Sequence, residues 1–300
     1  MDYMELVKRS INNAWNYKFL WLFGFFVSAS DGFGGFNFWK EDINIDKWDH
    51  WWHNLDLPDF LPALLVIFII SAFALAIIMW IMSVLSEGAL IYGVTRKEFN
   101  LPADFSRSWS AGVNKFLHLF GIMLVATLFV IAMIISLLMI VIPSYFAAIG
   151  LGIILTIFAI PVLIAVIIIV VCIEGWAIRF AVLYSESWLD AIGKGWQLFK
   201  ENVPKTLAIA FSSLLSQFVI WCLLIIGMAI LSIPFVIMGS INLWLGLLPG
   251  LSLAVLIIIL SSAFFGTMTS SIWTLGFIQL TGYSPVDRVP DPGISPAVTS

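Results

Sequence analysis

Two long stretches without charge constrain this chain more than any other feature. No Asp, Glu, Lys or Arg occurs from Phe116 to Ile173, and none occurs from Thr206 to Val286. A helix of about 20 residues crosses the ~30 Å hydrocarbon core of a bilayer, so each stretch is long enough to cross and turn back. Turn-favouring pairs lie inside both stretches, and we expect the turns there: Pro143-Ser144, Gly239-Ser240 and Pro249-Gly250.

Composition excludes a soluble domain. Only 11% of the residues are charged and 61% are hydrophobic, whereas a soluble domain carries about 25% charged residues. The sequence therefore predicts an all-α fold, a polytopic transmembrane helical bundle with about six spans. The expected spans are Asn16–Ala29, which is short, and Leu61–Ser86, Phe116–Ile142, Leu151–Ile173, Thr206–Met238 and Leu251–Leu275.

Lysines and arginines predict how the chain is oriented. With the N-terminus inside, twelve of the fourteen basic residues fall in cytoplasmic segments and only Lys40 and Lys47 fall outside. An excess of Lys and Arg on the cytoplasmic side is typical of membrane proteins. We therefore expect both termini in the cytoplasm and an extracytoplasmic loop at residues 30–60.

Short matches along the chain indicate internal repeats. Glu174-Gly175 lies 87 residues after Glu87-Gly88, and Lys194-Gly195-Trp196 follows Arg107-Ser108-Trp109 at the same offset. These echoes predict one transmembrane domain, residues 1–285, made of three parallel units at about 1–95, 96–183 and 184–285. Residues 286–300 would form a short cytoplasmic tail.

Each predicted unit begins with an amphipathic segment and continues as a helical hairpin. Apolar residues recur at helical spacing around Trp109 and again around Trp196, and Ser187-x-x-Asp190 resembles a capping box. A basic helix with an aromatic stripe beside a span favours the membrane interface. We expect both tryptophans to lie there.

The opening pattern from Ser10 to Phe26, which includes Asn-Asn-Ala-Trp-Asn-Tyr-Lys-Phe-Leu-Trp-Leu-Phe-Gly, resembles a broad group of prokaryotic membrane proteins. That group is similar to the membrane domain fused to glycerophosphodiester phosphodiesterases. The resemblance implies a prokaryotic inner membrane and supports the fold. The catalytic domain of those enzymes has no counterpart here, so no active site is implied.

Glu87 and Glu174 are the charged residues of greatest interest. Both lie at the inner ends of apolar spans, where an ionised carboxylate needs a partner or water. A base follows each one twenty residues later, Arg107 in one unit and Lys194 in the next. One hypothesis is that each glutamate pairs with a base on the adjoining amphipathic helix. The other is that the two carboxylates act in gating or proton coupling in a transporter.

The extracytoplasmic loop is rich in Trp and Asp. Asp42, Asn44 and Asp46 match the first ligand positions of an EF-hand loop, but Lys47 and His53 stand where that loop needs Gly and Glu. His50 and His53 have helical spacing without an evident third ligand. We therefore expect no metal there, and an aromatic element at the outer interface that contains Trp48, Trp51 and Trp52.

Catalytic motifs are absent from the sequence, and the basic residues form no single patch for nucleic acid. The isolated polar residues His118, Gln217 and Asn242 favour hydrogen bonds between helices. We expect a protein that is not an enzyme and has no cofactor, with the lipid bilayer and other membrane proteins as its partners. The leading hypothesis is an accessory or scaffold subunit, and the alternative is a small transporter for a lipid-like or small solute.

Overall fold

Helices make up the part of the chain that the structure describes. The structure is a computed structural model, and it describes residues 2–33 and 61–284. No strand occurs among these residues, which confirms the all-α fold class. The helices are α1 (Tyr3–Asn16), α2 (Leu20–Phe33), α4 (Leu61–Glu98), α5 (Phe105–Ala147), α6 (Ile149–Leu183), α7 (Trp188–Glu201), α8 (Val203–Ile241) and α9 (Leu243–Thr281).

Five of these helices are long and apolar enough to cross a membrane: α4, α5, α6, α8 and α9. They contain 35 to 43 residues. At 1.5 Å per residue their lengths are about 52–65 Å, well beyond a hydrocarbon core of about 30 Å. Helix α2, which covers most of the expected first span, is described over 14 residues and is not among the five.

The hairpin turns lie a few residues away from the predicted Pro and Gly pairs. Helix α5 continues through Pro143 and ends at a single extended residue, Ala148, before α6 begins. Helix α8 runs past Gly239 to Asn242, and Pro249 lies inside α9. Both turns thus fall between the predicted spans, at residues 143–150 and 239–250, but the predicted Pro and Gly pairs do not form them. A continuous helix keeps the backbone groups satisfied in hydrocarbon, and helices in a membrane tolerate an internal Pro.

Side chains at the helix ends explain where several helices begin. The Asp2 carboxylate accepts hydrogen bonds from the backbone N–H groups of Met4 and Glu5, and Asp104 caps α5 in the same way. The Ser187 hydroxyl accepts from the Asp190 N–H at 3.3 Å and donates to its carboxylate at 2.6 Å. The predicted cap at Ser187 is thus confirmed.

One end of the molecule is packed, and we call it the hub. It comprises α1, α2, α7 and the inner parts of the long helices, at residues 83–98, 105–123, 172–183, 203–213 and 263–281. Its largest buried side chains, among them Trp176, Phe23 and Phe277, are at most 1% exposed. Every charged residue of helices α4 to α9 lies in the hub.

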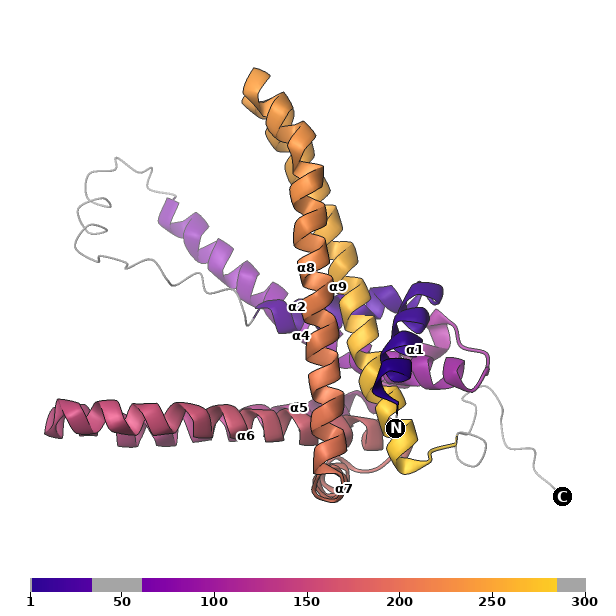
Figure 1. The fold of residues 1–300 in the computed structure, drawn as a ribbon, viewed down its shortest axis with the longest axis vertical. Coiled ribbons are helices and arrows are strands. Elements are labelled where there is room, and N and C mark those ends of the chain that lie inside the picture. Colours follow the sequence, from indigo (N-terminus) through magenta and orange to yellow (C-terminus); the bar gives the residue numbers. More distant parts are fainter. Residues whose placement is uncertain (1, 34–60, 285–300) are drawn as a thin grey trace.

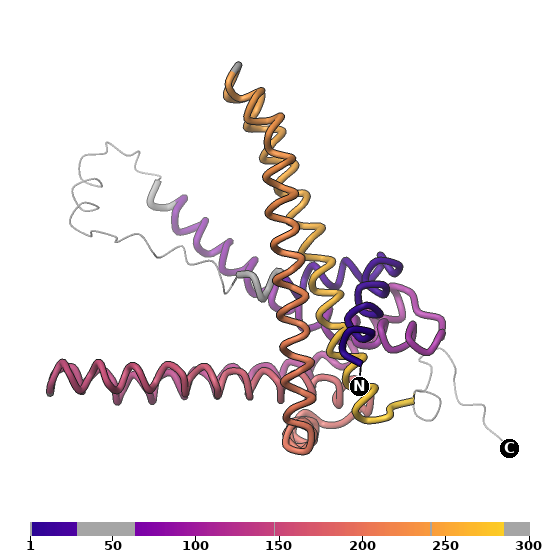
Figure 2. Tube along the Cα trace, viewed as in Figure 1, coloured from indigo at the N-terminus to yellow at the C-terminus, as the bar shows by residue number. Residues whose placement is uncertain are grey.

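Three arms extend from the hub: the outer part of α4 (residues 61–82), the α5/α6 pair (124–171) and the α8/α9 pair (214–262). Figure 1 shows them pointing in three different directions, with α4 between the two paired arms. In Figure 2 the chain can be followed out along one helix of each paired arm and back along the other. Arm side chains are largely exposed, as Phe68 (72%) and Phe146 (88%) illustrate. The arms are therefore the parts suited to hydrocarbon.

Glycines allow the helices to cross closely inside the hub. A Cβ atom built on Gly266 of α9 would lie 2.1 Å from the Gly24 carbonyl oxygen of α2. A Cβ atom on Gly112 of α5 would lie 2.3 Å from the Leu85 carbonyl oxygen of α4. Small residues at such crossings let backbones approach one another in membrane proteins. These crossings fix where the arms leave the hub.

Candidate functional site: a buried ion pair in the hub

A buried ion pair and a hydrogen bond join one helix from each of the three arms. Glu87 comes from α4, Arg179 from α6 and Ser270 from α9. The Arg179 Nη2 atom lies 3.3 Å from Glu87 Oε1, and the Ser270 hydroxyl donates to the same oxygen at 3.4 Å. The two ionic side chains are only 3% and 11% exposed. These two polar contacts of Glu87 therefore link the bases of all three arms.

The surroundings of Arg179 hold its guanidinium in place. Its Nη1 donates to the Gly175 carbonyl at 2.7 Å, and its guanidinium lies 5.9 Å from the centre of the Trp273 ring. Trp273 packs edge-on against Trp176, whose Nε1 donates to the Thr206 hydroxyl at 3.2 Å. Among the described residues, Arg179 Nε has no hydrogen-bond partner. The charge is thus enclosed by packed rings and backbone carbonyls.

This arrangement suits a structural role better than a mobile one. Burying two charges is costly unless geometry and extra hydrogen bonds compensate, and removing one partner leaves the other charge buried and unpaired. Glu87 is 8% exposed as a whole residue. Its carboxylate is therefore held in the packed interior of the hub, in contact with Arg179 and Ser270.

The partner of Glu87 differs from the one that the sequence predicted. The predicted pairing was with a base on the adjoining amphipathic helix, such as Arg107, whereas Glu87 pairs with Arg179 of α6. Arg107 lies in the first turn of α5, where its backbone N–H donates to the Asp104 side chain. Arg179 was missed because 92 residues separate it from Glu87. Its signal was a lone arginine at the end of an apolar run.

The second predicted pair also differs. Lys194 forms its ion pair with Glu186, in the connection just before α7, and not with Glu174. The Lys194 and Glu186 side chains are 46% and 25% exposed, so water screens this pair. Glu174 is half-buried in α6, while Glu87 is buried. The two glutamates therefore occupy unlike surroundings although their sequence contexts match.

The two predicted interface tryptophans lie in different surroundings. The Trp109 ring stacks on Phe105 of its own helix and on Phe23 of α2, with centroid distances of 6.2 and 6.4 Å. Trp196 is 42% exposed, stacks on Phe199, and has Lys200 Nζ 5.3 Å above its ring. Trp109 therefore packs on the hub, whereas Trp196 presents an aromatic and cationic surface.

The isolated polar residues have distinct local roles. Gln217 of α8 donates to the Thr269 hydroxyl of α9 at 2.6 Å, which confirms the expected bond between helices. Asn242 instead caps α9 by accepting from the Trp244 N–H at 3.0 Å. His118 Nδ1 is buried with no partner in the described part of the chain. These residues do not converge with Glu87 on a common set of contacts.

The loop candidates lie outside the described residues. They are Asp42, Asn44, Asp46, His50 and His53 for a metal, and Trp48, Trp51 and Trp52 for the outer interface. Within residues 2–33 and 61–284, no three His, Cys, Asp or Glu side chains come close enough to hold a metal ion.

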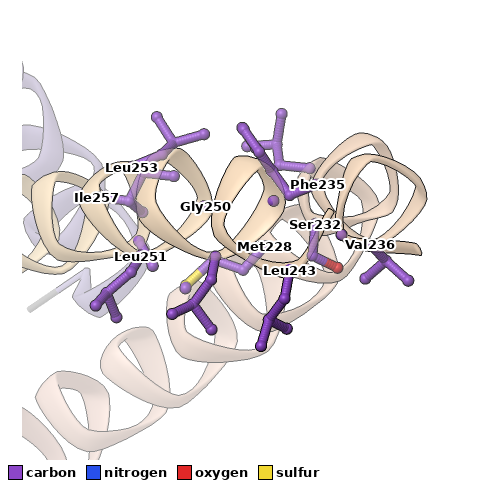
Figure 3. A pocket seen from close by; sticks show the side chains of 14 residues that line it. Met228, Ser232, Phe235, Val236, Leu243, Gly250, Leu251, Leu253 and Ile257 are labelled. Atoms are coloured by element: carbon purple, nitrogen blue, oxygen red, sulfur yellow. The ribbon is translucent and has the colours of Figure 1, made fainter. Parts of the chain in front are cut away.

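An apolar groove of about 520 Å³ lies on the α8/α9 arm. Its lining includes Met228 and Phe235 of α8 and Leu243 and Leu251 of α9, while Gly250 leaves room between the two helices (Figure 3). Ser232 is the polar side chain in this lining. The groove is suited to a hydrocarbon chain, and its lining contains none of the hub residues.

The comparisons with known proteins identify one family. A family model described as a family of unknown function (DUF7544) matches residues 13–282. The chain belongs to this family. The DUF7544 match begins near the end of α1 and ends at Gly282, the residue that caps α9, so it covers all three arms and the hub apart from most of α1. No curated protein and no solved structure matches the chain.

Proposed function

We propose that this DUF7544 protein is a non-catalytic membrane scaffold, an accessory subunit that binds other membrane proteins along its arms. The observation that carries this proposal is the divergence of the arms. Phe129, Phe158 and Phe218 are 55%, 69% and 66% exposed on three different arm helices. Beyond the hub, the two helices of each paired arm pack mainly on each other, and much of their apolar surface is left for other molecules.

The hub gives such a scaffold fixed geometry. Association of helices in a membrane depends on close packing and on hydrogen bonds between helices. Here the glycine crossings and the Glu87–Arg179 pair join elements of different arms. A rigid hub would hold the arms apart at set positions, so that spans of partner proteins fit between them.

The charges and the helix ends support the location that we propose. The charge-free arms suit the hydrocarbon core, and the hub carries all the basic residues of α4 to α9. The first turn of α1 and the last turn of α9 both belong to the hub, which supports termini on one side. By the positive-inside tendency that side is the cytoplasm, and the sequence resemblance supports the inner membrane of a prokaryote.

The proposal includes a parallel repeat. After Glu87-Gly88, the start of α5 folds back on α4 through Gly112; after Glu174-Gly175, α7 folds back on α6 through Gly195. A Cβ atom on Gly195 would lie 3.0 Å from the Ala177 backbone nitrogen. At the 87-residue offset Gly195 matches Ser108, so the two glycines differ by about one helical turn in the register of the repeat. What the two units share is a helix that folds back on its predecessor after the Glu-Gly pair, and this supports the repeat.

A small transporter for a lipid-like solute is the second candidate. The groove between α8 and α9 favours it, because its apolar lining suits an acyl chain. In the transporter that the sequence suggests, Glu87 and Glu174 act as gating carboxylates. The buried ion pair of Glu87 argues against such a gating role, since a gating carboxylate needs access to water or solute.

Photocrosslinking in the native membrane tests the scaffold. Phe129, Phe158 and Phe218 would each be replaced by a benzophenone amino acid, with Asn114 on the exposed hub surface as the control position. We expect discrete protein adducts from the arms, absent at Asn114, and the same protein in stoichiometric amount after gentle purification. Lipid adducts alone at all three positions, together with a purified chain that carries a defined solute and no protein partner, would replace the scaffold with the transporter.

A further inference from the structure

Helix α1 has a broad apolar side, and only part of it is buried against the hub. Leu6, Ser10 and Ala14 are fully buried against the hub. Roughly 120° around the helix from this face, Met4, Ile11 and Trp15 are 78%, 37% and 64% exposed. At 100° per residue these three side chains lie within about 40° of one another, so they form one stripe. We infer that this stripe and the lysines beside it form a binding surface for anionic phospholipids.

Lysines flank the stripe. Lys8 lies beside it on α1 and is exposed. Lys18 is exposed in the connection to α2, and Lys97 at the end of α4 places its Nζ 5.1 Å above the Tyr17 ring. Arg9 adds little charge, because it forms an ion pair with Glu98 of α4. These three lysines therefore give the surface its positive charge.

Apart from Glu98, which pairs with Arg9, the acidic residues near the surface lie at the far end of α1. Asp2 uses its carboxylate to cap the helix, and Glu5 is the exposed acid one turn before Lys8. The charge is therefore most positive around Trp15, Lys18 and Lys97. That is also where the stripe meets the membrane arms.

The stripe is continuous with the surface of the α8/α9 arm. The Trp15 ring packs edge-on against Trp21 and Phe264, with centroid distances of 6.5 and 6.3 Å. Trp21 Nε1 donates to the Ala14 carbonyl at 2.6 Å, which ties α2 to the end of α1. Phe264 lies where α9 leaves the hub, and about one helical turn farther out Ile259 and Leu260 are 42% and 45% exposed. Lipid around this arm therefore reaches Trp15 directly.

Charge complementarity selects the kind of lipid. An amphipathic helix at an interface buries its apolar face about 5–10 Å into the boundary between headgroups and acyl chains. The cytoplasmic leaflet is anionic, and each lysine near it contributes roughly a five-fold preference. Trp and Tyr favour the same depth. An apolar stripe bordered by three lysines thus fits anionic headgroups, and this inference does not depend on a protein partner.

Depth measurements on the purified chain test the position of α1. Cysteines would replace Met4 and Ile11 on the stripe and Asn12 beside it, in a background without Cys172 and Cys222. After spin labelling and reconstitution in vesicles of phosphatidylcholine with 30% phosphatidylglycerol, we expect positions 4 and 11 to be relaxed by oxygen and protected from a water-soluble nickel chelate. Position 12 should show more nickel access. Equal nickel access at all three positions would overturn the inference. Protection of positions 4 and 11 from both oxygen and the nickel chelate would also overturn it, because it would mean that protein covers the stripe.

Lipid preference tests the charge. A fluorophore at position 11 would be quenched by doxyl-labelled phosphatidylglycerol or doxyl-labelled phosphatidylcholine at equal amounts. We expect quenching several-fold stronger with phosphatidylglycerol, and a ratio near one in the triple variant K8Q/K18Q/K97Q. The matched triple variant K194Q/K200Q/K205Q removes the same charge from the α7–α8 side and should keep the preference. A ratio near one in the unmodified chain, or equal loss in both triple variants, would refute a specific surface.

Discussion

Replacing Glu87 by glutamine gives the sharpest test of the hub. The Glu87→Gln variant keeps an oxygen that can accept from Arg179 and Ser270, but it leaves a buried arginine without a counter-charge. Removing one partner of a buried ion pair costs about 3–5 kcal/mol of stability. Because the amide still accepts hydrogen bonds, we expect the lower end, about 3 kcal/mol.

The expected loss is large enough to measure by heating in detergent. At about 2–4 °C per kcal/mol, Glu87→Gln should lower the midpoint of thermal unfolding by roughly 6–12 °C. Tryptophan fluorescence suits the assay because Trp176 and Trp273 pack next to the pair. Glu186→Gln is the matched control, since its pair with Lys194 is partly exposed, and we expect a change of about 1 kcal/mol or less.

A double variant separates the effect of the unpaired charge from a general loss of packing around Glu87. In Glu87→Leu/Arg179→Met both charges are removed, and apolar replacements of a buried pair are often neutral or stabilising. We expect the double variant to recover most of the stability lost in Glu87→Gln. The reasoning is refuted if Glu87→Gln unfolds within about 2 °C of the unmodified chain, or if the double variant is no more stable than the single one.

Three further substitutions test other parts of the hub under the same assay. Gly266→Ala places a methyl group against the Gly24 carbonyl, and overpacking of this kind costs about 1–3 kcal/mol of stability. In the control Gly227→Ala the added methyl group has nothing within 4 Å, so we expect no loss of stability. Equal effects of the two substitutions would contradict the close crossing of α2 and α9. Trp176→Ala should cost about 3–5 kcal/mol of stability, because the Trp176 ring is fully buried. Trp244 is exposed on its arm, so Trp244→Ala should change stability little. Similar losses in the two variants would argue against the hub as the packed core. Ser187→Ala should cost about 1 kcal/mol and speed hydrogen exchange in the first turn of α7, and unchanged exchange would mean that the cap is unimportant.

Much of the architecture follows from local sequence. The charge-free runs predict long apolar helices because hydrocarbon length and backbone satisfaction constrain any such run in the same way. The cap at Ser187 is equally local, since donor and acceptor are three residues apart. The turns were less predictable: a Pro inside a membrane helix does not have to end it, so α5 and α9 pass through Pro143 and Pro249.

The tertiary structure alone decided how these helices meet. Glu87 and Glu174 begin matching segments, yet only Glu87 lies at the crossing of α4, α6 and α9 beside Arg179. Which base a buried carboxylate meets depends on crossings between helices far apart in the chain, and those crossings depend on close approaches such as Gly24 against Gly266. The divergence of the arms has the same origin, because hydropathy marks a helix as suited to the membrane and carries no information about its direction relative to the others.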